Sequence, residues 1–207
     1  AMAASAGRGI GSAAGDLSCS SMELLDRRRE LDSLEELVAA ARAGRGDAVV
    51  LRGAAGIGLT ALLDHVARAA ASGCRVVRLA GVRSEVDLPL AGLQRLALLF
   101  DEPTSPIQSP AVAENEQLTT GLAVHALLTQ AARADPVVLL IDDGHWLDLP
   151  SLEAVAFACR RLRQHRVAAV VAIHAATTQR STLHGLPDVF VGGLGSAAAA
   201  QLLTSAL

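Results

Sequence analysis

The sequence contains no lysine, because all 18 of its basic residues are arginines, and its formal net charge is −3. No long basic run is present, so we expect no nucleic-acid-binding surface. No apolar run approaches the roughly 18 to 20 residues that cross a bilayer, and the N-terminus lacks the apolar core of a signal peptide. We therefore expect a cytoplasmic protein without a membrane partner. Cys19, Cys74 and Cys159 lack C-x-x-C spacing, which favours free thiols over metal ligands or disulfides.

The composition is that of a globular domain. Of the 207 residues, 51% are hydrophobic and 19% are charged. A chain of this size buries a substantial core, as one large α/β domain or as one domain plus a fragment of another.

Residues 53–60 carry the most informative motif. They read Gly-Ala-Ala-Gly-Ile-Gly-Leu-Thr, the phosphate-binding pattern G-x-x-x-x-G-K-[ST] with leucine in place of lysine. An apolar run at 48–51 predicts a strand before the motif, and helical spacing at 60–67 predicts a helix after it. In such a loop, glycines let backbone N–H groups converge on phosphate oxygens at a helix N-terminus. The candidate nucleotide-contacting residues of the loop are Gly53, Ala54, Ala55, Gly56, Ile57, Gly58, Leu59 and Thr60.

We expect leucine at position 59 to impair hydrolysis more than nucleotide binding. The lysine of this motif follows the negative charge that moves during phosphoryl transfer, and leucine carries neither charge nor hydrogen-bond donor. We therefore expect weak nucleotide binding and negligible hydrolysis. A bias of the chain against lysine leaves an alternative, in which Arg27 or Arg52 supplies the missing charge.

A second motif ends an apolar run, where Asp142 and Asp143 follow residues 137–141. Such a run is typical of a buried parallel strand, whose carboxyl end lies where ligands bind in α/β sheets. In phosphate-loop enzymes the first acid holds Mg²⁺ together with the loop hydroxyl, here Asp142 with Thr60. Asp143 is then the candidate catalytic residue that orients or deprotonates water. The alternative is that the two acids only cap a strand and solvate a turn.

The remaining patterns predict an α/β three-layer sandwich with a mainly parallel sheet of about five strands. The strands that end at Leu51 and Ile141 should be adjacent or nearly so. Asp148 and Pro150 fit a helix N-cap and first turn. The other predicted strands span 74–80, 167–173 and 189–191, the other predicted helices span 28–43, 90–100 and 118–132, and the longest loop spans 101–116.

Three stretches, residues 24–31, 50–60 and 140–148, resemble the signature motifs of the ATPase domain of large LuxR-type, MalT-like transcriptional regulators. That family belongs to the signal-transducing NTPases of the AAA-related superfamily, and the similarity covers most of residues 22–195. The resemblance implies ATP or ADP and Mg²⁺ as ligands, and a nucleotide-dependent switch that acts through protein contacts. In that family, a separate helix-turn-helix domain binds DNA.

The sequence departs from the family at three positions. Asp26 replaces a glycine whose neighbour, Arg27, is retained, and a carboxylate there would repel a nucleotide. Leu59 replaces the lysine, and His174 stands where relatives carry a phosphate-sensing arginine. Arg27 and His174 thus remain nucleotide-contacting candidates by resemblance, although the pattern favours His174 as a simple strand-end residue. Trp146 is expected to pack structurally.

The predicted domain organisation has three parts: residues 1–21 form a flexible tail, 22–192 a P-loop NTPase-like domain, and 193–207 the truncated start of a helical lid. The leading hypothesis is a regulatory pseudo-ATPase module of a LuxR-family regulator. Its partners would be nucleotide, other domains of that regulator or other protomers, and the fragment alone would not bind DNA. One alternative is an active Mg²⁺-dependent ATPase with an arginine replacing the lysine; another is a site for a different anion.

Overall fold

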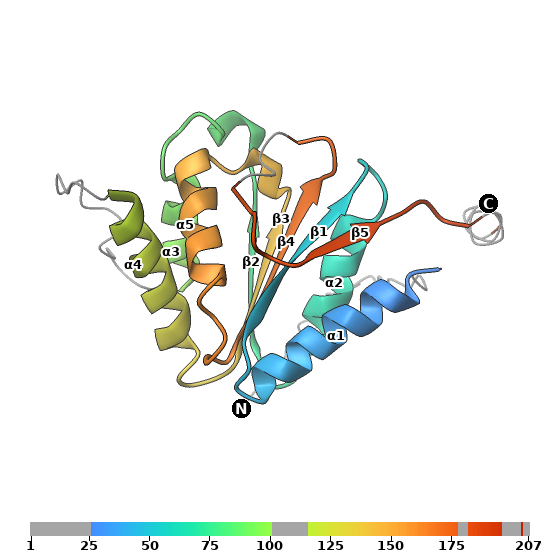
Figure 1. Cartoon of the computed structure of the whole chain (residues 1–207), viewed down its shortest axis with the longest axis horizontal. Helices are drawn as coiled ribbons and strands as arrows, with labels where there is room; N and C mark the ends of the chain where they lie inside the picture. Colours follow the sequence, from blue (N-terminus) through green and yellow to red (C-terminus); the bar gives the residue numbers. More distant parts are fainter. Residues whose placement is uncertain (1–25, 101–115, 178–181, 196–203, 205–207) are drawn as a thin grey trace, which may run out of the picture.

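The fold, a computed structural model that describes residues 26–100, 116–177, 182–195 and 204, is built around one parallel sheet (Figure 1). Its five strands lie in the order β2-β3-β4-β1-β5, and every neighbouring pair is parallel. This confirms the predicted sheet. The strands are β1 (Asp47–Gly53), β2 (Arg75–Ala80), β3 (Val137–Asp142), β4 (Val167–His174) and β5 (Asp188–Val191).

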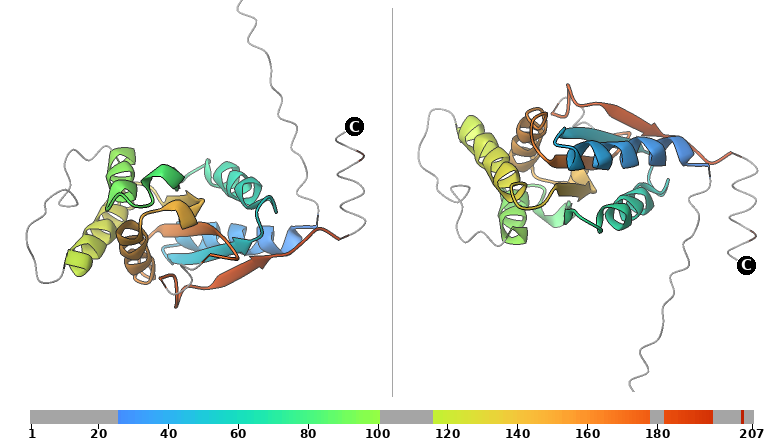
Figure 2. Two further views of the ribbon diagram at one scale, coloured as in Figure 1. Left: turned by 90° about the horizontal axis from the view of Figure 1, so that it is seen from above. Right: turned by 90° about the horizontal axis from the view of Figure 1, so that it is seen from below.

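Helices cover both faces of the sheet, which gives the predicted three layers. Helices α1 (Arg28–Arg42) and α2 (Leu59–Ala70) lie on one side, as Figure 1 and both views of Figure 2 show. Helices α3 (Ala91–Leu99), α4 (Glu116–Ala131) and α5 (Leu149–Cys159) lie on the other side. Two short 3₁₀ helices, η1 (Arg83–Glu85) and η3 (Gly144–Trp146), follow β2 and β3.

The central strands are buried on both faces, as their continuous apolar runs predicted. In β3, Val138 and Leu140 join the core formed with α1 and α2. The alternate residues Val137, Leu139 and Ile141 join the core formed with α3, α4 and α5. This alternation follows from the two-residue period of a strand. Asp142 ends β3 and Asp143 follows it, so both acids lie at the carboxyl edge of the sheet.

Several sequence predictions can be compared directly with the fold. Leu51 lies in β1 and Ile141 in β3, and only β4 separates these strands. Asp148 caps α5, because its Oδ1 accepts a hydrogen bond from Ser151 N at 3.0 Å and Pro150 lies in the first turn. The expected tail at 1–21, almost all of the loop at 101–116 and most of the expected lid at 193–207 lie outside the described residues.

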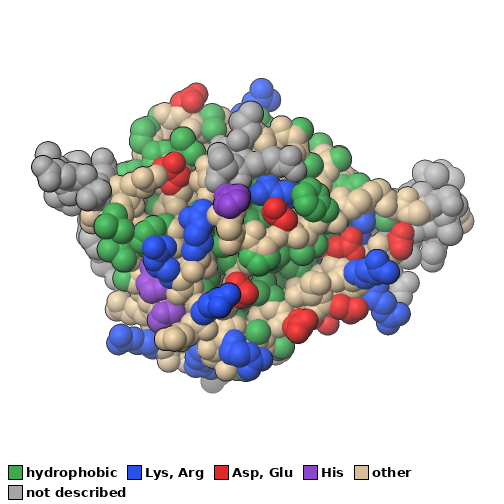
Figure 3. Space-filling model, in the orientation of Figure 1, with side chains coloured by type: hydrophobic (Ala, Val, Ile, Leu, Met, Phe, Trp, Pro, Cys, Tyr) green, Lys and Arg blue, Asp and Glu red, His purple; other side chains and the backbone are tan. Residues whose placement is uncertain are grey.

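The outer surface carries charges of both signs. Figure 3 shows arginine and acidic side chains intermingled on the face that is turned to the viewer in Figure 1. Within the described segments, none of the helices has the length and apolar character needed to cross a membrane.

Candidate functional site

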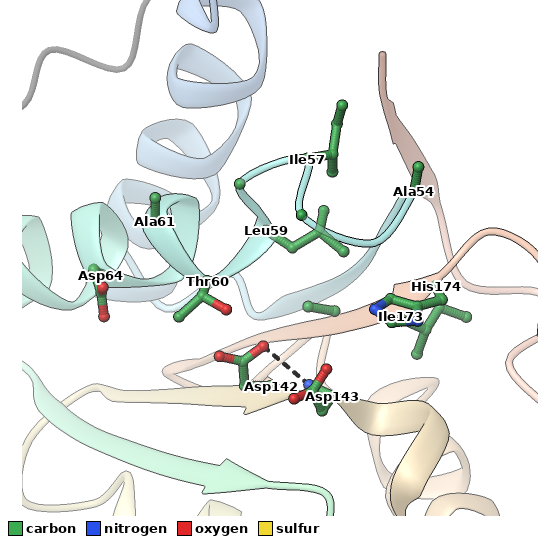
Figure 4. A pocket seen from close by; sticks show the side chains of 13 residues that line it. Ala54, Ile57, Leu59, Thr60, Ala61, Asp64, Asp142, Asp143, Ile173 and His174 are labelled. Carbon is green, nitrogen blue, oxygen red and sulfur yellow. Dashed lines mark hydrogen bonds between the residues drawn. The ribbon is translucent and has the colours of Figure 1, made fainter. Parts of the chain in front are cut away.

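The glycine-rich loop forms one wall of a cavity at the carboxyl edge of the sheet. It connects the end of β1 to the start of α2, and the cavity has a volume of about 440 Å³. That volume lies in the range of small-ligand sites, which is roughly 300 to 1,000 Å³. Figure 4 shows how the lining side chains converge. The lining residues are Ala54, Gly56, Ile57, Gly58, Leu59, Thr60, Ala61, Asp64, Asp142, Asp143, Ala172, Ile173 and His174.

The loop conformation depends on its glycines. Gly56 has φ 74° and Gly58 has φ 101°, which are left-handed conformations that a side chain disfavours. Gly53 is required for space, because a Cβ there would lie 2.5 Å from Ile57 Cγ2. Gly53 and Ala55 shape the loop without lining the cavity. The described backbone thus keeps a turn that opens directly into a helix N-terminus, the arrangement that favours anions.

Leu59 is the first residue of α2 and belongs to both the cavity and the core. Only 8% of it is exposed, and it packs in the apolar cluster that includes Leu51 and Leu62. Figure 4 shows its side chain pointing along the inside of the loop, toward the side on which Asp143 and His174 lie. The position reserved for an ammonium group is therefore filled by hydrocarbon.

Asp142 and Asp143 lie at the end of β3, across the cavity from Thr60 in the first turn of α2. The Thr60 hydroxyl and the Asp142 carboxylate face each other in Figure 4, which is the oxygen chemistry that Mg²⁺ prefers. Asp142 Oδ1 accepts a hydrogen bond from the backbone N–H of Asp143 at 3.0 Å. Asp143 itself has φ 46°, an uncommon value for a residue with a side chain. The residues present thus fit a magnesium-bound phosphate.

The cavity wall is acidic. Asp64, Asp142 and Asp143 line it, whereas none of the arginines in the described ranges does so. The neighbouring cation is Arg78 on β2, which forms an ion pair with Asp64 and lies 3.9 Å from Asp142 Oδ2. Sequence reasoning missed Arg78 and Asp64. The signal that could have found Arg78 is the pairing of β2 beside β3, which sets Arg78 opposite Leu140, two residues before Asp142.

Comparison with known proteins agrees with this architecture. The sequence profile described as the AAA ATPase domain matches residues 23–171. The chain belongs to this AAA ATPase domain family. A comparison with curated proteins gives no match.

Two solved structures resemble the fold of this AAA domain. One is the Cdc6p protein from Pyrobaculum aerophilum, with a TM-score of 0.61 and 18% identity over 88% of this chain and 49% of that chain. The other is described as a DNA replication initiation factor, with a TM-score of 0.53 and 14% identity over 87% of this chain and 50% of that one. The AAA domain therefore spans about half the length of these two structures.

Neither Arg27 nor Arg52 lines the cavity of the AAA domain. Arg27 is buried, donates a hydrogen bond to Ile57 O at 3.3 Å and lies 3.6 Å from Glu30. It therefore contacts the backbone of the loop without lining the cavity. Arg52 is also buried and pairs with Asp188, Nε to Oδ1, at 2.5 Å. Both arginines therefore already have partners in the fold.

The structure gives Asp26 a different partner from the one that the sequence suggested. Its carboxylate Oδ2 accepts a hydrogen bond from Gly195 N at 3.0 Å, and it is absent from the residues that line the cavity. Asp26 has φ 57°, a conformation that glycine adopts without strain. This positive φ is a physical reason why glycine would suit this position in the LuxR-type regulators that the sequence resembles.

His174 ends β4 at the cavity and stacks on His145, with ring centroids 3.9 Å apart. His145 also contacts Trp146 at 4.7 Å, and Trp146 lies under the Arg83 guanidinium at 5.1 Å. Burial lowers the pKa of His145 and His174 lowers it further, while Asp143 and Asp142 act in the opposite direction. The histidine pair was missed as a unit, because 29 residues separate its members in the sequence.

Proposed function

We propose that this AAA domain is a regulatory, nucleotide-binding-type module of a LuxR-family transcriptional regulator in the cytoplasm. It binds ATP or ADP with Mg²⁺ weakly or not at all, and it hydrolyses ATP negligibly. The observation that carries this proposal is Leu59, a buried leucine in the lysine position of an otherwise retained phosphate loop. The three signature stretches described above support the regulator context.

The proposed roles of the residues follow from their places around the cavity. Backbone N–H groups between Gly53 and Thr60 would contact phosphate oxygens at the N-terminus of α2. Thr60 and Asp142 would hold Mg²⁺, and Asp143 would orient water. When bound, the Mg²⁺ ion supplies charge neutralisation between the phosphates, which the acidic wall alone would repel.

Negligible hydrolysis follows from what Leu59 removes. Only interactions that are stronger in the transition state than in the ground state accelerate the chemical step. A lysine contributes such an interaction, because it meets the charge that develops during transfer, whereas backbone donors bind both states. The loop that remains thus supports ground-state binding without the corresponding gain in rate.

The proposed switch acts through protein contacts. Its partners are other domains of the same regulator or other protomers, with ATP favouring an assembled state as in the resembling family. Binding to DNA by this domain alone is not proposed.

The second candidate is an active Mg²⁺-dependent ATPase in which an arginine replaces the lysine. Arg78 is the observation that favours it, because this guanidinium already lies beside Asp64 and Asp142. Arg27 and Arg52 favour it less, since each is held by partners away from the cavity. A site for a different anion is the third candidate, supported by the retained glycine loop.

Calorimetric titration with ATP and with ADP, each with and without Mg²⁺, tests the proposal together with a phosphate-release assay. We expect weak, Mg²⁺-dependent binding or none, and no turnover above that of Asp143→Ala. Turnover that Asp143→Ala abolishes and Arg78→Gln also abolishes would instead establish the arginine-assisted ATPase. Tight binding of phosphate or another anion without nucleotide would favour the third candidate.

A further inference from the structure

Three side chains with metal-ligand chemistry converge beside the phosphate loop. They are Asp143, which precedes η3, His145 within η3, and His174 at the end of β4. One ligand atom from each residue lies within 4.8 Å of the others. The two segments that carry them come together only because β3 and β4 are neighbours in the sheet.

His145 has an unmet hydrogen-bonding requirement. Its side chain is only 7% exposed, and neither Nδ1 nor Nε2 has a hydrogen-bond partner among the described residues. Its Nδ1 lies 4.0 Å from Asp143 Oδ1, beyond hydrogen-bond distance. Buried polar groups are almost always hydrogen-bonded, so the two nitrogens of this imidazole are available to bind a ligand. One of its two nitrogen atoms belongs to the cluster with one atom each of Asp143 and His174.

We propose that Asp143, His145 and His174 bind one divalent transition-metal ion of the Zn²⁺ type. Two imidazoles and one carboxylate are a donor set for Zn²⁺, Co²⁺ or Ni²⁺, whereas Mg²⁺ prefers oxygen ligands alone. The site is therefore different in chemistry from the Thr60 and Asp142 pair. The inference does not depend on nucleotide binding.

Binding one ion requires the His174 ring to turn out of its stack on His145, because each imidazole nitrogen binds a metal in the plane of its ring. Ligand atoms bound to one tetrahedral Zn²⁺ at about 2.0 Å lie roughly 3.3 Å apart, so separations of up to 4.8 Å must also shorten. Asp143 is half-exposed and His174 is partly exposed at the cavity wall, so both can rotate. His145 is buried, so we expect the side chains of Asp143 and His174 to move toward it. With three protein ligands, one position stays open toward the cavity that Asp143 and His174 line.

The backbone around the cluster is held tightly, as a binding site requires. A Cβ on Gly81 would lie 2.1 Å from Asp143 O, and a Cβ on Gly144 would lie 3.0 Å from Val171 Cγ1. These two close approaches seat η3 against the end of β2 and against β4. The positions of Asp143 and His145 are therefore set by the fold before any ion arrives, which limits the cost of ordering them.

Titration of the nucleotide-free domain with Zn²⁺ in a calorimeter tests the proposal, with Co²⁺ absorption spectra as a second readout of coordination. We expect one Zn²⁺ per chain and a Co²⁺ spectrum typical of tetrahedral coordination. His174→Asn and Asp143→Asn should each weaken Zn²⁺ binding by at least about 10-fold, because loss of a ligand should cost no less than loss of a residue that only orients one. Both residues are partly exposed, so these variants should remain folded, which circular dichroism checks.

His125→Gln is the matched control. It removes one histidine of a second ring pair, His125 and His165, whose centroids are 5.1 Å apart. The control should leave Zn²⁺ binding unchanged. The proposal is overturned if Zn²⁺ does not bind, if binding survives in His174→Asn and Asp143→Asn, or if His125→Gln weakens it equally. His145→Asn adds a third test if it folds, but the two exposed ligands decide the matter without it.

Discussion

The Arg52 guanidinium on β1 and the Asp188 carboxylate on β5 form an ion pair across 136 residues of sequence, with Nε 2.5 Å from Oδ1. Arg52 is 3% exposed, whereas the Asp188 side chain is 37% exposed. A buried charge without its partner is costly, so this pair commits Arg52 to the sheet edge. Arg52 is also absent from the residues that line the cavity.

Asp188→Ala should therefore destabilise the domain by about 2 kcal/mol, because it removes the acceptor of a hydrogen bond to a charged group. Urea unfolding at neutral pH measures the change. Glu35→Gln is the control, because it removes the carboxylate from an exposed pair with His65 and should cost less than about 1 kcal/mol. Equal losses in the two variants would show that Arg52 is solvated without Asp188.

Leu59→Lys should strengthen nucleotide binding. A charge-assisted hydrogen bond contributes about 1.5 to 3 kcal/mol, which corresponds to roughly 10- to 150-fold in affinity. Calorimetry with ATP and Mg²⁺ measures this gain, and phosphate release should rise in parallel. Leu59→Met, which adds no charge, should match the unmodified chain. Were the unmodified chain to bind ATP as tightly as Leu59→Lys, another cation would already occupy the lysine's role.

Thr60→Ala should reduce the part of the affinity that depends on Mg²⁺, because the hydroxyl faces Asp142 across the cavity. The loss of one neutral oxygen contact predicts about 2- to 10-fold weaker binding. The measurement is best made in the Leu59→Lys background, where binding is strong enough to compare with and without Mg²⁺. Thr60→Ser keeps the hydroxyl and should behave like the parent. A loss that is identical in the absence of Mg²⁺ would contradict the proposed metal role.

Acid should destabilise the domain through His165, whose pKa is lowered from 6.5 by burial and by the neighbouring His125. Above pH 6.5 the ring is neutral in both states, so this contribution is constant. Below that pH His165 is protonated in the unfolded chain but still neutral in the folded domain. The free energy of unfolding therefore falls as the pH decreases, until the pH reaches the lowered pKa of His165 in the folded domain. Urea unfolding at several pH values should show a shallower decline for His165→Gln than for the exposed control His184→Gln.

The sheet and the phosphate loop could be predicted from sequence because their signals are local. The apolar run 137–141 and the glycines between 53 and 58 each specify their own conformation within a few residues. The N-cap of α5 is also a local signal, because Asp148 Oδ1 accepts a hydrogen bond from the backbone N–H of Ser151, only three residues later. The order of the strands was predicted only in part, as the adjacent or nearly adjacent placement of the strands that end at Leu51 and Ile141.

The parts that escaped prediction depend on contacts between distant segments. From sequence, Arg52 is a possible phosphate ligand, but in the fold it forms an ion pair with Asp188. Asp26 is predicted to repel a nucleotide, but in the fold its carboxylate accepts a hydrogen bond from Gly195 N at 3.0 Å. His145 and His174 each read as ordinary residues, because only the pairing of β3 with β4 stacks their rings. Side-chain partners across a sheet are set by packing, which no local pattern encodes.

Asp26 and Arg27 are consecutive, yet they hold two segments that are far apart in the sequence. Arg27 donates to Ile57 O in the loop, and Asp26 accepts from Gly195 N in the backbone that leaves β5. One turn thus anchors both the ligand-facing loop and the path of the chain beyond the sheet. Coupling free energies are reciprocal. A ligand that fixes Ile57 would bias the course of the chain after β5, and a partner that fixes that course would alter the loop's affinity by the same factor.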